Sequence, residues 1–187
     1  TDDVVAIQAA VDNHQTIHLR NGTYLISVPI RESTNSGQRR LVGENKHDTI
    51  IKADGSFTID APMIWFGNSN GHGNYRLQIE DIKFDGNSRA VGIRAHEAGT
   101  SEIGQCRFLD CKIAVQNVGS ISLDIHHHEI SNCDIGVECT VPINGTPADI
   151  DDITTTANSL PMRTNMTSIQ NGWISGGTQG IILGGAQ

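Results

Sequence analysis

Aromatic residues and clustered positive charge are both scarce in this chain. Only 4% of its 187 residues are aromatic, and the formal net charge is -8. Arg39-Arg40 is the only compact basic cluster. Because phosphate backbones are bound by clusters of Lys and Arg, we expect no nucleic-acid partner. An acidic surface does not exclude glycans, which a local groove can bind.

Long hydrophobic runs and metal-binding cysteine spacings are also missing. No apolar run approaches the roughly 20 residues of a membrane-spanning helix, so we expect no membrane partner. The cysteine spacing matches no zinc pattern, and the sequence has no phosphate-binding glycine loop or nucleophile elbow. We therefore expect no metal or cofactor from the residues alone, and we expect the thiols to be buried in a core. The cysteines are Cys106, Cys111, Cys133 and Cys139.

What the sequence does contain is an internal repeat. Each copy has an apolar residue, a large apolar residue five positions later, a small residue six positions after that, and then Val or Ile. The steps between copies are 24, 22 and 44 residues, and 44 is twice 22. The four copies are Ile79-Phe84-Ala90-Val91, Ile103-Phe108-Ala114-Val115, Ile125-Ile130-Gly136-Val137 and Ile169-Ile174-Gly180-Ile181.

This repeat predicts a stack of short strands joined by tight turns. No copy can bury its apolar residues alone, but stacked copies bury one continuous core, with neighbouring strands ~4.8 Å apart. The column of small residues marks a bend, where a bulky side chain would clash with the next coil. We therefore predict an all-β fold, a right-handed parallel β-helix with coils of about 22 residues. Residues 1–187 form a single domain in this interpretation.

The first residues predict a short capping helix. Residues 2–13 place Val4, Ile7 and Val11 on one face at helical spacing. Thr1 or Asp2 can cap the start of this helix, and acidic residues favour its positive end. A helix here would cover the open end of the β-helix, where unpaired strand edges invite aggregation.

Further strands and one interruption complete the pattern. Strands are expected at residues 16–19, 24–26, 41–43 and 49–52. Residues 140–166 break the 22-residue template, so we predict an insertion loop there rather than a regular coil. Long loops of this kind either form functional walls or are plain surface loops.

Several segments resemble a known family. TDDVVAIQAAVDN, TIHLRNGTYLIS, LVGENKHDTIIKADG, IEDIKFDGN, IGQCRFLDCKIAV and IHHHEISNCDIGV are similar to the pectate lyase-like superfamily of β-helices. The branch concerned is shared by bacterial polysaccharide-degrading enzymes and phage tailspikes. The resemblance implies an extracellular polysaccharide as partner, a lyase or glycoside hydrolase activity, and an extracellular or virion-surface location. It also implies a homotrimer if the chain is a tailspike, and it is the sole reason to consider Ca²⁺.

Two departures from the family limit that inference. A strand and a Gly-Asp-Gly turn usually precede the TDD segment and are absent, so we expect a piece of a longer protein, truncated at both ends. The Asp-Asp pair of polygalacturonase-type hydrolases would fall near Lys112-Ile113 or Asp134-Ile135, and neither matches. Gly71-His72-Gly73 has the letters of another hydrolase motif, but it precedes the clear coils and is interpreted as a turn.

Outward columns of the repeat supply the candidate site residues. Hydrolysis of a glycosidic bond needs two carboxyl groups roughly 5 Å or 6.5–9.5 Å apart. Lyase chemistry needs a base together with a cation or metal that neutralises the substrate carboxylate. Such groups would occupy outward positions on adjacent coils. The columns are Lys83, Arg107, Glu129 and Trp173; Ser88, Lys112, Asp134 and Thr178; and Asp81, Gln105, His127 and Asn171.

Two interpretations of these columns stay open. Arg107 with Glu129, and Lys112 with Asp134, would lie one coil apart and could be exposed ion-pair ladders worth ~0–1 kcal/mol each. Alternatively, the columns form a polar groove in which Trp173 stacks on a sugar. In the second interpretation the catalytic residues are Glu129, Asp134 and His127, and the substrate-binding residues are Arg107, Lys112 and Trp173.

The run His126-His127-His128 is a further candidate. Side chains alternate along a strand, which would send His128 inward and His127 outward, so the three cannot share one metal ion. His126 or His127 could instead act as a base. Asp85 lies beside an expected turn at residues 85–87, and a structural role is expected for it.

These observations leave two functions in competition. The first is a carbohydrate-active β-helix, either a lyase or a glycoside hydrolase of an extracellular polysaccharide, in the manner of a phage tailspike. The second is a non-catalytic glycan-binding or structural β-helix, such as an adhesin or stalk, favoured by the lack of a recognisable acid pair. The columns also align Cys111 with Cys133, and the spacing alone does not decide whether they pair.

Overall fold

The computed structural model describes residues 2–32, 38–67, 76–96, 98–120, 122–140 and 167–183. Within these ranges the chain forms one helix, α1 (Val4–Asn13), and three six-stranded sheets. The first sheet, sheet A, contains β1 (Thr16–Leu19), β4 (Gln38–Gly43), β7 (Arg76–Glu80), β10 (Thr100–Gly104), β13 (Ser122–His126) and β16 (Thr167–Gln170).

The other two sheets follow the first along every coil. Sheet B contains β2 (Gly22–Ile26), β5 (Thr49–Ala53), β8 (Lys83–Asp85), β11 (Arg107–Leu109), β14 (Glu129–Ser131) and β17 (Trp173–Ser175). Sheet C contains β3 (Ile30–Arg31), β6 (Pro62–Gly67), β9 (Val91–His96), β12 (Ile113–Val118), β15 (Ile135–Thr140) and β18 (Gln179–Leu183).

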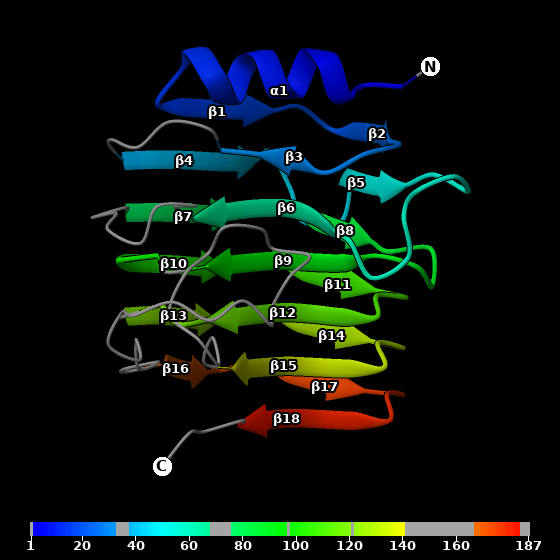
Figure 1. The fold of residues 1–187 in the computed structure, drawn as a ribbon, viewed down its shortest axis with the longest axis vertical. Coiled ribbons are helices and arrows are strands. Elements are labelled where there is room, and N and C mark those ends of the chain that lie inside the picture. Colours follow the sequence, from blue (N-terminus) through cyan, green and yellow to red (C-terminus); the bar gives the residue numbers. More distant parts are fainter. Residues whose placement is uncertain are drawn as a thin grey trace, which may run out of the picture.

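The chain visits sheets A, B and C in turn, and it repeats this circuit along the long axis (Figure 1). Every strand pairing among the described residues, for example β10 with β13 and β11 with β14, is parallel and joins one circuit to the next. Three strands therefore make one coil, and the described strands make six coils. The predicted all-β parallel β-helix is confirmed.

The predicted register is also observed. Ile79 pairs with Ile103, Ile103 with Ile125, and Ile125 with Ile169. Phe84 and Phe108 stack with ring centroids 5.3 Å apart, and both are fully buried. These columns form one hydrophobic core along the inside of the coils.

The expected interruption falls mostly on residues that the structure does not describe. Of the predicted insertion loop, residues 140–166, only Thr140 is described, and it ends β15. Strand β13 pairs directly with β16, so 44 residues separate Ile125 from its partner Ile169. The turn predicted at Gly71-His72-Gly73 also lies outside the described residues.

Helix α1 covers the first coil, as predicted, and lies beside β1 and β3 at the N-terminal end (Figure 1). The predicted face is buried, with Val4, Ile7 and Val11 packed against the core. The helix begins at Val4 rather than at residue 2, and the two acids before it bond to backbone amides. Asp2 Oδ1 accepts from the Val4 amide at 3.1 Å, and Asp3 Oδ2 accepts from the Leu25 amide at 2.9 Å.

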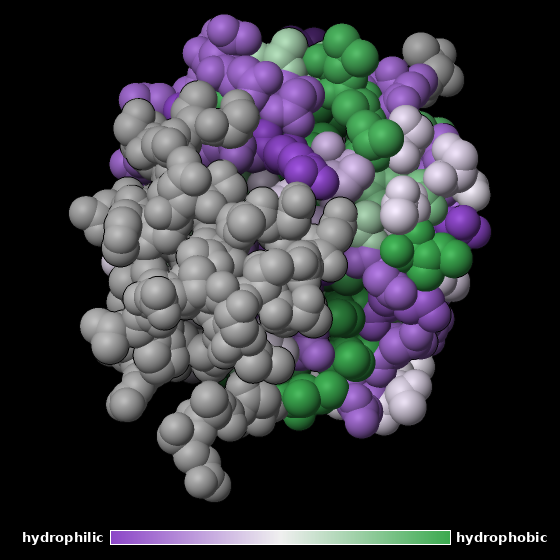
Figure 2. All heavy atoms as spheres, viewed as in Figure 1, coloured by the Kyte–Doolittle hydropathy of each residue, from purple (hydrophilic) through white to green (hydrophobic). Residues whose placement is uncertain are grey.

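Hydrophobic side chains are interspersed with hydrophilic ones on the coloured part of the face shown in Figure 2. The large hydrophobic side chains that remain exposed are Val5, Leu25, Val28, Ile59, Trp173 and Ile181. All four cysteines are buried free thiols, as predicted.

Single residues in the left-handed conformation turn the chain between sheets A and B. His127 has φ +51°, and Asp81, Gln105 and Asn171 have φ between +50° and +57°. His127 is exposed, as predicted, but it sits at a corner between β13 and β14 rather than inside a strand, so strand alternation is not the cause. His128 does point inward, and it is 3% exposed.

Candidate functional site

Polar side chains line the outer face of sheet A. The inward column of Ile79, Ile103, Ile125 and Ile169 is flanked on both sides by outward positions, because side chains alternate along a strand. The outward residues before that column are Gln78, Glu102, Asp124 and Ser168, and those after it are Glu80, Gly104, His126 and Gln170.

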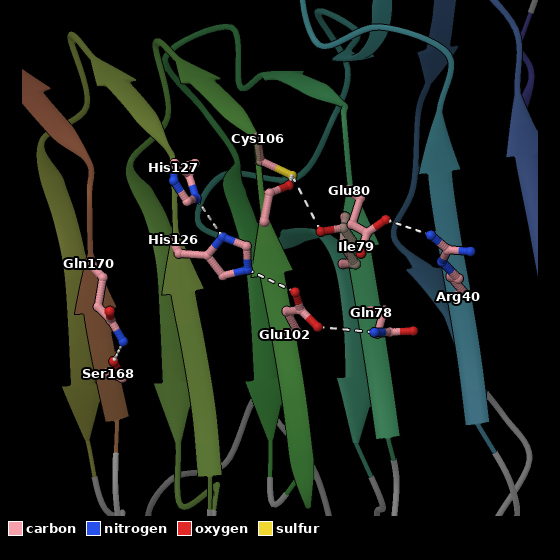
Figure 3. Close-up of polar contacts among 11 residues, drawn as sticks. Arg40, Gln78, Ile79, Glu80, Glu102, Cys106, His126, His127, Ser168 and Gln170 are labelled. Carbon is pink, nitrogen blue, oxygen red and sulfur yellow. Dashed lines mark hydrogen bonds and ion pairs between the residues drawn. The ribbon is translucent and has the colours of Figure 1, made fainter.

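Glu102 is the centre of a hydrogen-bond chain across three coils (Figure 3). Gln78 Nε2 donates to Glu102 Oε2 at 3.0 Å, and His126 Nε2 lies 2.8 Å from Glu102 Oε1. His126 Nδ1 in turn lies 2.9 Å from Nδ1 of His127. The bonds from Gln78 and His126 lower the pKa of the Glu102 carboxyl, so Glu102 is held ionised at neutral pH.

Asp124 is the neighbour of Glu102 on the next coil. The two residues are directly paired in the β10–β13 register. Asp124 Oδ1 is buried and has no hydrogen-bond partner among the described residues. Because neighbouring strands lie ~4.8 Å apart, the two side chains start from backbone positions separated by about the ~5 Å found between the carboxyl groups of retaining glycoside-cleaving enzymes. The pair therefore combines a carboxylate whose two oxygens are both bonded, Glu102, with a carboxyl that has one buried oxygen without a partner among the described residues, Asp124.

Glu80 lies on the same face of sheet A, but its carboxylate forms an ion pair with Arg40. Arg40 Nη2 lies 2.7 Å from Glu80 Oε2 (Figure 3). This pair joins the second coil to the third, on the N-terminal side of Glu102 and Asp124. Because Arg40 neutralises Glu80, we treat Glu80 as a neighbour of the site and not as a member of the carboxyl pair formed by Glu102 and Asp124.

Around the corner, on sheet B, Glu129 accepts two cations. Lys46 Nζ lies 2.8 Å from Glu129 Oε1, and Arg107 Nε lies 3.5 Å from Glu129 Oε2. The bond from Lys46 is the largest cause that lowers the pKa of Glu129. Glu129 is therefore a stable anion and is poorly suited to deliver a proton.

Lys46 reaches Glu129 from a longer corner in the second coil. Residues 44–48 connect β4 to β5, where the next coils turn with a single left-handed residue. The buried Thr49 hydroxyl accepts from the Glu44 amide at 3.1 Å and from the Asn45 amide at 3.3 Å. This anchoring lets the 44–48 corner overhang sheet B.

The structure brings the predicted sugar-binding residues of sheet B together. Arg107 pairs in register with Glu129, and Glu129 with Trp173. Trp173 is 60% exposed, so its ring is available to a ligand. Lys83 lies on the other side of Arg107.

The remaining predicted residues lie at opposite ends of the sheet B strands. Lys112 Nζ and Asp134 Oδ2 form an ion pair 2.9 Å long at the corner between sheets B and C. Its bond to Asp134 raises the pKa of Lys112. His127, the third predicted catalytic residue, lies at the corner between sheets A and B. The structure therefore separates Asp134 and Lys112 from His127, with Glu129 between them along the chain.

Glu102, Asp124 and Gln78 were missed in the sequence. The signal was available, because each directly precedes an isoleucine of the repeat. The predicted site positions were the outward columns of sheet B and its two corners, together with His126 at the end of β13. The same register applied one residue before Ile103 and Ile125 would have found the carboxyl pair.

The described ranges contain no metal cluster of the usual kind. No three His, Cys, Asp or Glu side chains within them are arranged to hold a metal ion.

Asp85, expected to be structural, accepts a bond from Lys52 Nζ at 2.8 Å and from the Asn87 amide at 3.1 Å. No helix in the described part of the chain is long and apolar enough to span a membrane.

Comparisons with known proteins bear on the fold. No protein-family model matches the chain, and no curated protein matches it. Among solved structures it is similar to "Geobacillus virus E2 - ORF18", with 21% sequence identity and a TM-score of 0.55. The match covers 75% of this chain and 34% of the viral one, so this chain spans about a third of that protein. Identity at this level shows a shared fold, and membership of the pectate lyase-like superfamily stays a prediction.

Proposed function

We propose that this chain belongs to a phage tailspike-like protein of the pectate lyase-like kind, which binds and cleaves an extracellular polysaccharide at the virion surface. The observation that carries the proposal is the carboxyl pair Glu102 and Asp124, side by side on adjacent coils of an outward face. The similarity in fold to a viral protein supports the virion context. A tailspike-like protein is also expected to assemble as a homotrimer.

The two carboxyl groups suit different roles in glycoside hydrolysis. Such a reaction needs one ionised carboxylate, as nucleophile or base, and one carboxylic acid that protonates the leaving oxygen. Glu102 takes the first role, because Gln78 and His126 hold it in the ionised form. Asp124 takes the second role, because it is the carboxyl residue directly paired with Glu102 in the β10–β13 register. Gln78 and His126 are positioning residues.

Sheet B supplies the binding surface next to this pair. The Trp173 ring offers a stacking platform for a sugar, and the Arg107 guanidinium offers donors for its hydroxyl or acidic groups. Glu129 holds Arg107 and Lys46 in place rather than reacting. Asp134 and Lys112 form an ion pair with each other and take no part in the cleavage step.

The test is polysaccharide cleavage by the protein and three matched variants. Release of reducing ends, or of unsaturated uronates, is measured over a panel of neutral and acidic polysaccharides. We expect Glu102→Gln and Asp124→Asn each to lower the rate roughly 10²–10⁴-fold. Glu138→Gln is the matched control, because Glu138 accepts from Gln116 at 2.7 Å on sheet C and lies outside the site. Retained activity in both site variants would overturn the assignment.

Non-catalytic glycan binding is the second candidate function. It is favoured by the ion pairs of Glu129 with Lys46 and of Asp134 with Lys112, because these are the two carboxylic acids that the sequence predicted to be catalytic. It predicts that the protein and Glu102→Gln bind the same polysaccharide equally, with no product over the whole panel. Trp173→Ala would then weaken binding, because the exposed ring is the stacking surface.

A further inference from the structure

Cys111 and Cys133 occupy the same position on consecutive coils. Cys111 lies between β11 and β12, and Cys133 lies between β14 and β15. The flanking strands are paired in register, and the Asp134 amide donates to the Cys111 carbonyl at 3.0 Å. Strands of neighbouring coils are ~4.8 Å apart, which lies within the Cα separation of ~4.4–6.8 Å that disulfides span.

The two thiols also adopt the same orientation and contact each other. Cys111 Sγ donates to the Leu109 carbonyl and Cys133 Sγ to the Ser131 carbonyl, each at 3.5 Å. A hydrogen bond between the two side chains is the largest cause that raises the pKa of Cys111 and lowers that of Cys133. A thiolate therefore forms more readily on Cys133, with Cys111 as its neighbouring donor.

The other two cysteines have no such neighbour. Cys106 is in the inward column that contains Ile82 and His128, and Cys139 pairs in register with Asn117 and Leu183. All four thiols are buried. Stacking on a second cysteine thus distinguishes Cys111 and Cys133 from Cys106 and Cys139, whose environments are otherwise similar.

We propose that Cys111 and Cys133 are a modification site, at which a low-molecular-weight disulfide converts the stacked thiols into a covalent link between the fourth and fifth coils. The Cys133 thiolate attacks one sulfur of the reagent, forms a mixed disulfide and expels one reagent thiolate. Cys111 loses its proton to solvent and attacks Cys133 Sγ, which expels the second reagent thiolate. The protein loses two protons and two electrons, and the reagent disulfide is reduced to two thiols.

Burial determines when the reaction occurs. Both cysteines are 2% exposed, so the oxidant reaches them while the chain folds or when the corner opens transiently. The link then fixes the alignment of β11 with β14. These strands carry Arg107 and Glu129, four residues before Cys111 and Cys133 respectively.

The experiment is refolding in a glutathione redox mixture, followed by alkylation and non-reducing peptide mapping. Combined cleavage after Lys, Arg and Glu places each cysteine in its own peptide, because cleavage sites fall at Glu102, Arg107, Lys112, Glu129 and Glu138. We expect one linked species, joining peptide 108–112 to peptide 130–138. Alkylated, unlinked Cys111 and Cys133 after oxidative refolding would overturn the proposal, as would a link to Cys106 or Cys139.

Variants separate the link from general effects of oxidation. Oxidised protein should unfold at a higher temperature than reduced protein, and Cys106→Ala and Cys139→Ala should keep this difference. Cys133→Ala should abolish it. If the map shows the link between Cys111 and Cys133, but oxidised and reduced wild-type protein unfold at the same temperature, the link does not stabilise the protein. The map of the wild-type protein decides the link itself even if Cys133→Ala does not fold.

Discussion

His126 Nε2 lies 2.8 Å from Glu102 Oε1, so an imidazole on the fifth coil bonds a carboxylate on the fourth. Gln78, on the third coil, bonds the other oxygen of the same carboxylate. Three consecutive coils therefore converge on Glu102. The pKa of Glu102 is lowered chiefly by Gln78 and then by His126, against a smaller opposing effect of burial.

The first prediction follows from this bonding. Gln78→Leu should raise the pKa of Glu102, because it removes the largest cause of the lowering. A carboxyl whose folded pKa is depressed stabilises the protein above its unfolded pKa, and this contribution is lost as pH falls through the folded value. In the variant this stabilisation is smaller and its loss is complete at a higher pH, and the acid limb of any activity also moves to higher pH. Titration of the side-chain carboxyl by NMR measures the change.

Gln116→Leu is the matched control for that variant. Gln116 donates to Glu138 in the same cross-coil manner, at 2.7 Å on sheet C. It should leave the titration of Glu102 unchanged. An unaltered Glu102 pKa in Gln78→Leu would show that the Gln78 bond does not hold the carboxylate.

The sequence was sufficient for the fold where one residue type recurred at fixed spacing. Ile79, Ile103, Ile125 and Ile169 predicted the register because an inward column must stay apolar in every coil. The polar positions beside them vary in type, so they give no repeat to detect. Their chemistry becomes visible only when the register is used to align Glu102 with Asp124.

Corners and overhanging segments were harder to predict. The conformation of His127 depends on a positive φ, which no periodic pattern of hydrophobic residues reports. The contact between Lys46 and Glu129 joins the second coil to the fifth, and it depends on how far residues 44–48 overhang. By contrast, Arg107 with Glu129 and Lys112 with Asp134 were predictable, because each pair is exactly one coil apart in the repeat.

The second prediction concerns acid sensitivity at His96. Its side chain is 5% exposed, and among the described residues its Nδ1 has no hydrogen-bond partner. Burial, followed by the charge of Arg94, lowers the pKa of His96 to about 4. The unfolded chain binds a proton near pH 6.5 and the folded chain does not, so stability is full above pH 6.5 and falls as pH drops toward 4. The loss is on the order of 3 kcal/mol.

Denaturant unfolding between pH 7 and pH 4 measures that loss. His96→Leu should flatten the pH dependence, because Leu cannot bind a proton in either state. His14→Gln is the control, since His14 is exposed just after α1 and its replacement should leave the slope unchanged. An equally steep slope in His96→Leu would assign the acid sensitivity to other groups, among them His128, whose pKa is also lowered by burial.

The third prediction concerns the contact between Gly172 and His128. A side chain at Gly172 would collide with the buried imidazole of His128 on the previous coil. We expect Gly172→Ala to destabilise the protein by roughly 1–3 kcal/mol, the usual cost of overpacking. Gly55→Ala should be close to neutral, because a Cβ there meets nothing within 4 Å. Combining Gly172→Ala with His128→Ala should cost less than the sum of the single changes, and additive free energies of unfolding would contradict the contact.

The fourth prediction separates the inside of the coils from the outside with two aromatic residues. Phe108→Ala removes one ring of the buried stack with Phe84 and should destabilise the protein by about 3–5 kcal/mol. Trp173→Ala removes a ring that is 60% exposed and should change the free energy of unfolding little. Trp173→Ala should instead weaken binding to whichever polysaccharide the protein recognises.

Chemical unfolding and glycan-binding isotherms, measured on both variants, test the two halves of this prediction together. Phe108→Leu, which keeps most of the buried apolar volume, should retain more stability than Phe108→Ala, because the smaller change leaves a smaller cavity. A large stability loss in Trp173→Ala with unchanged binding would mean that its ring packs against the coil rather than facing a ligand. In that case the sugar-binding surface would not include Trp173, and the pair Glu102 and Asp124 would have to bind the polysaccharide without a stacking platform on sheet B.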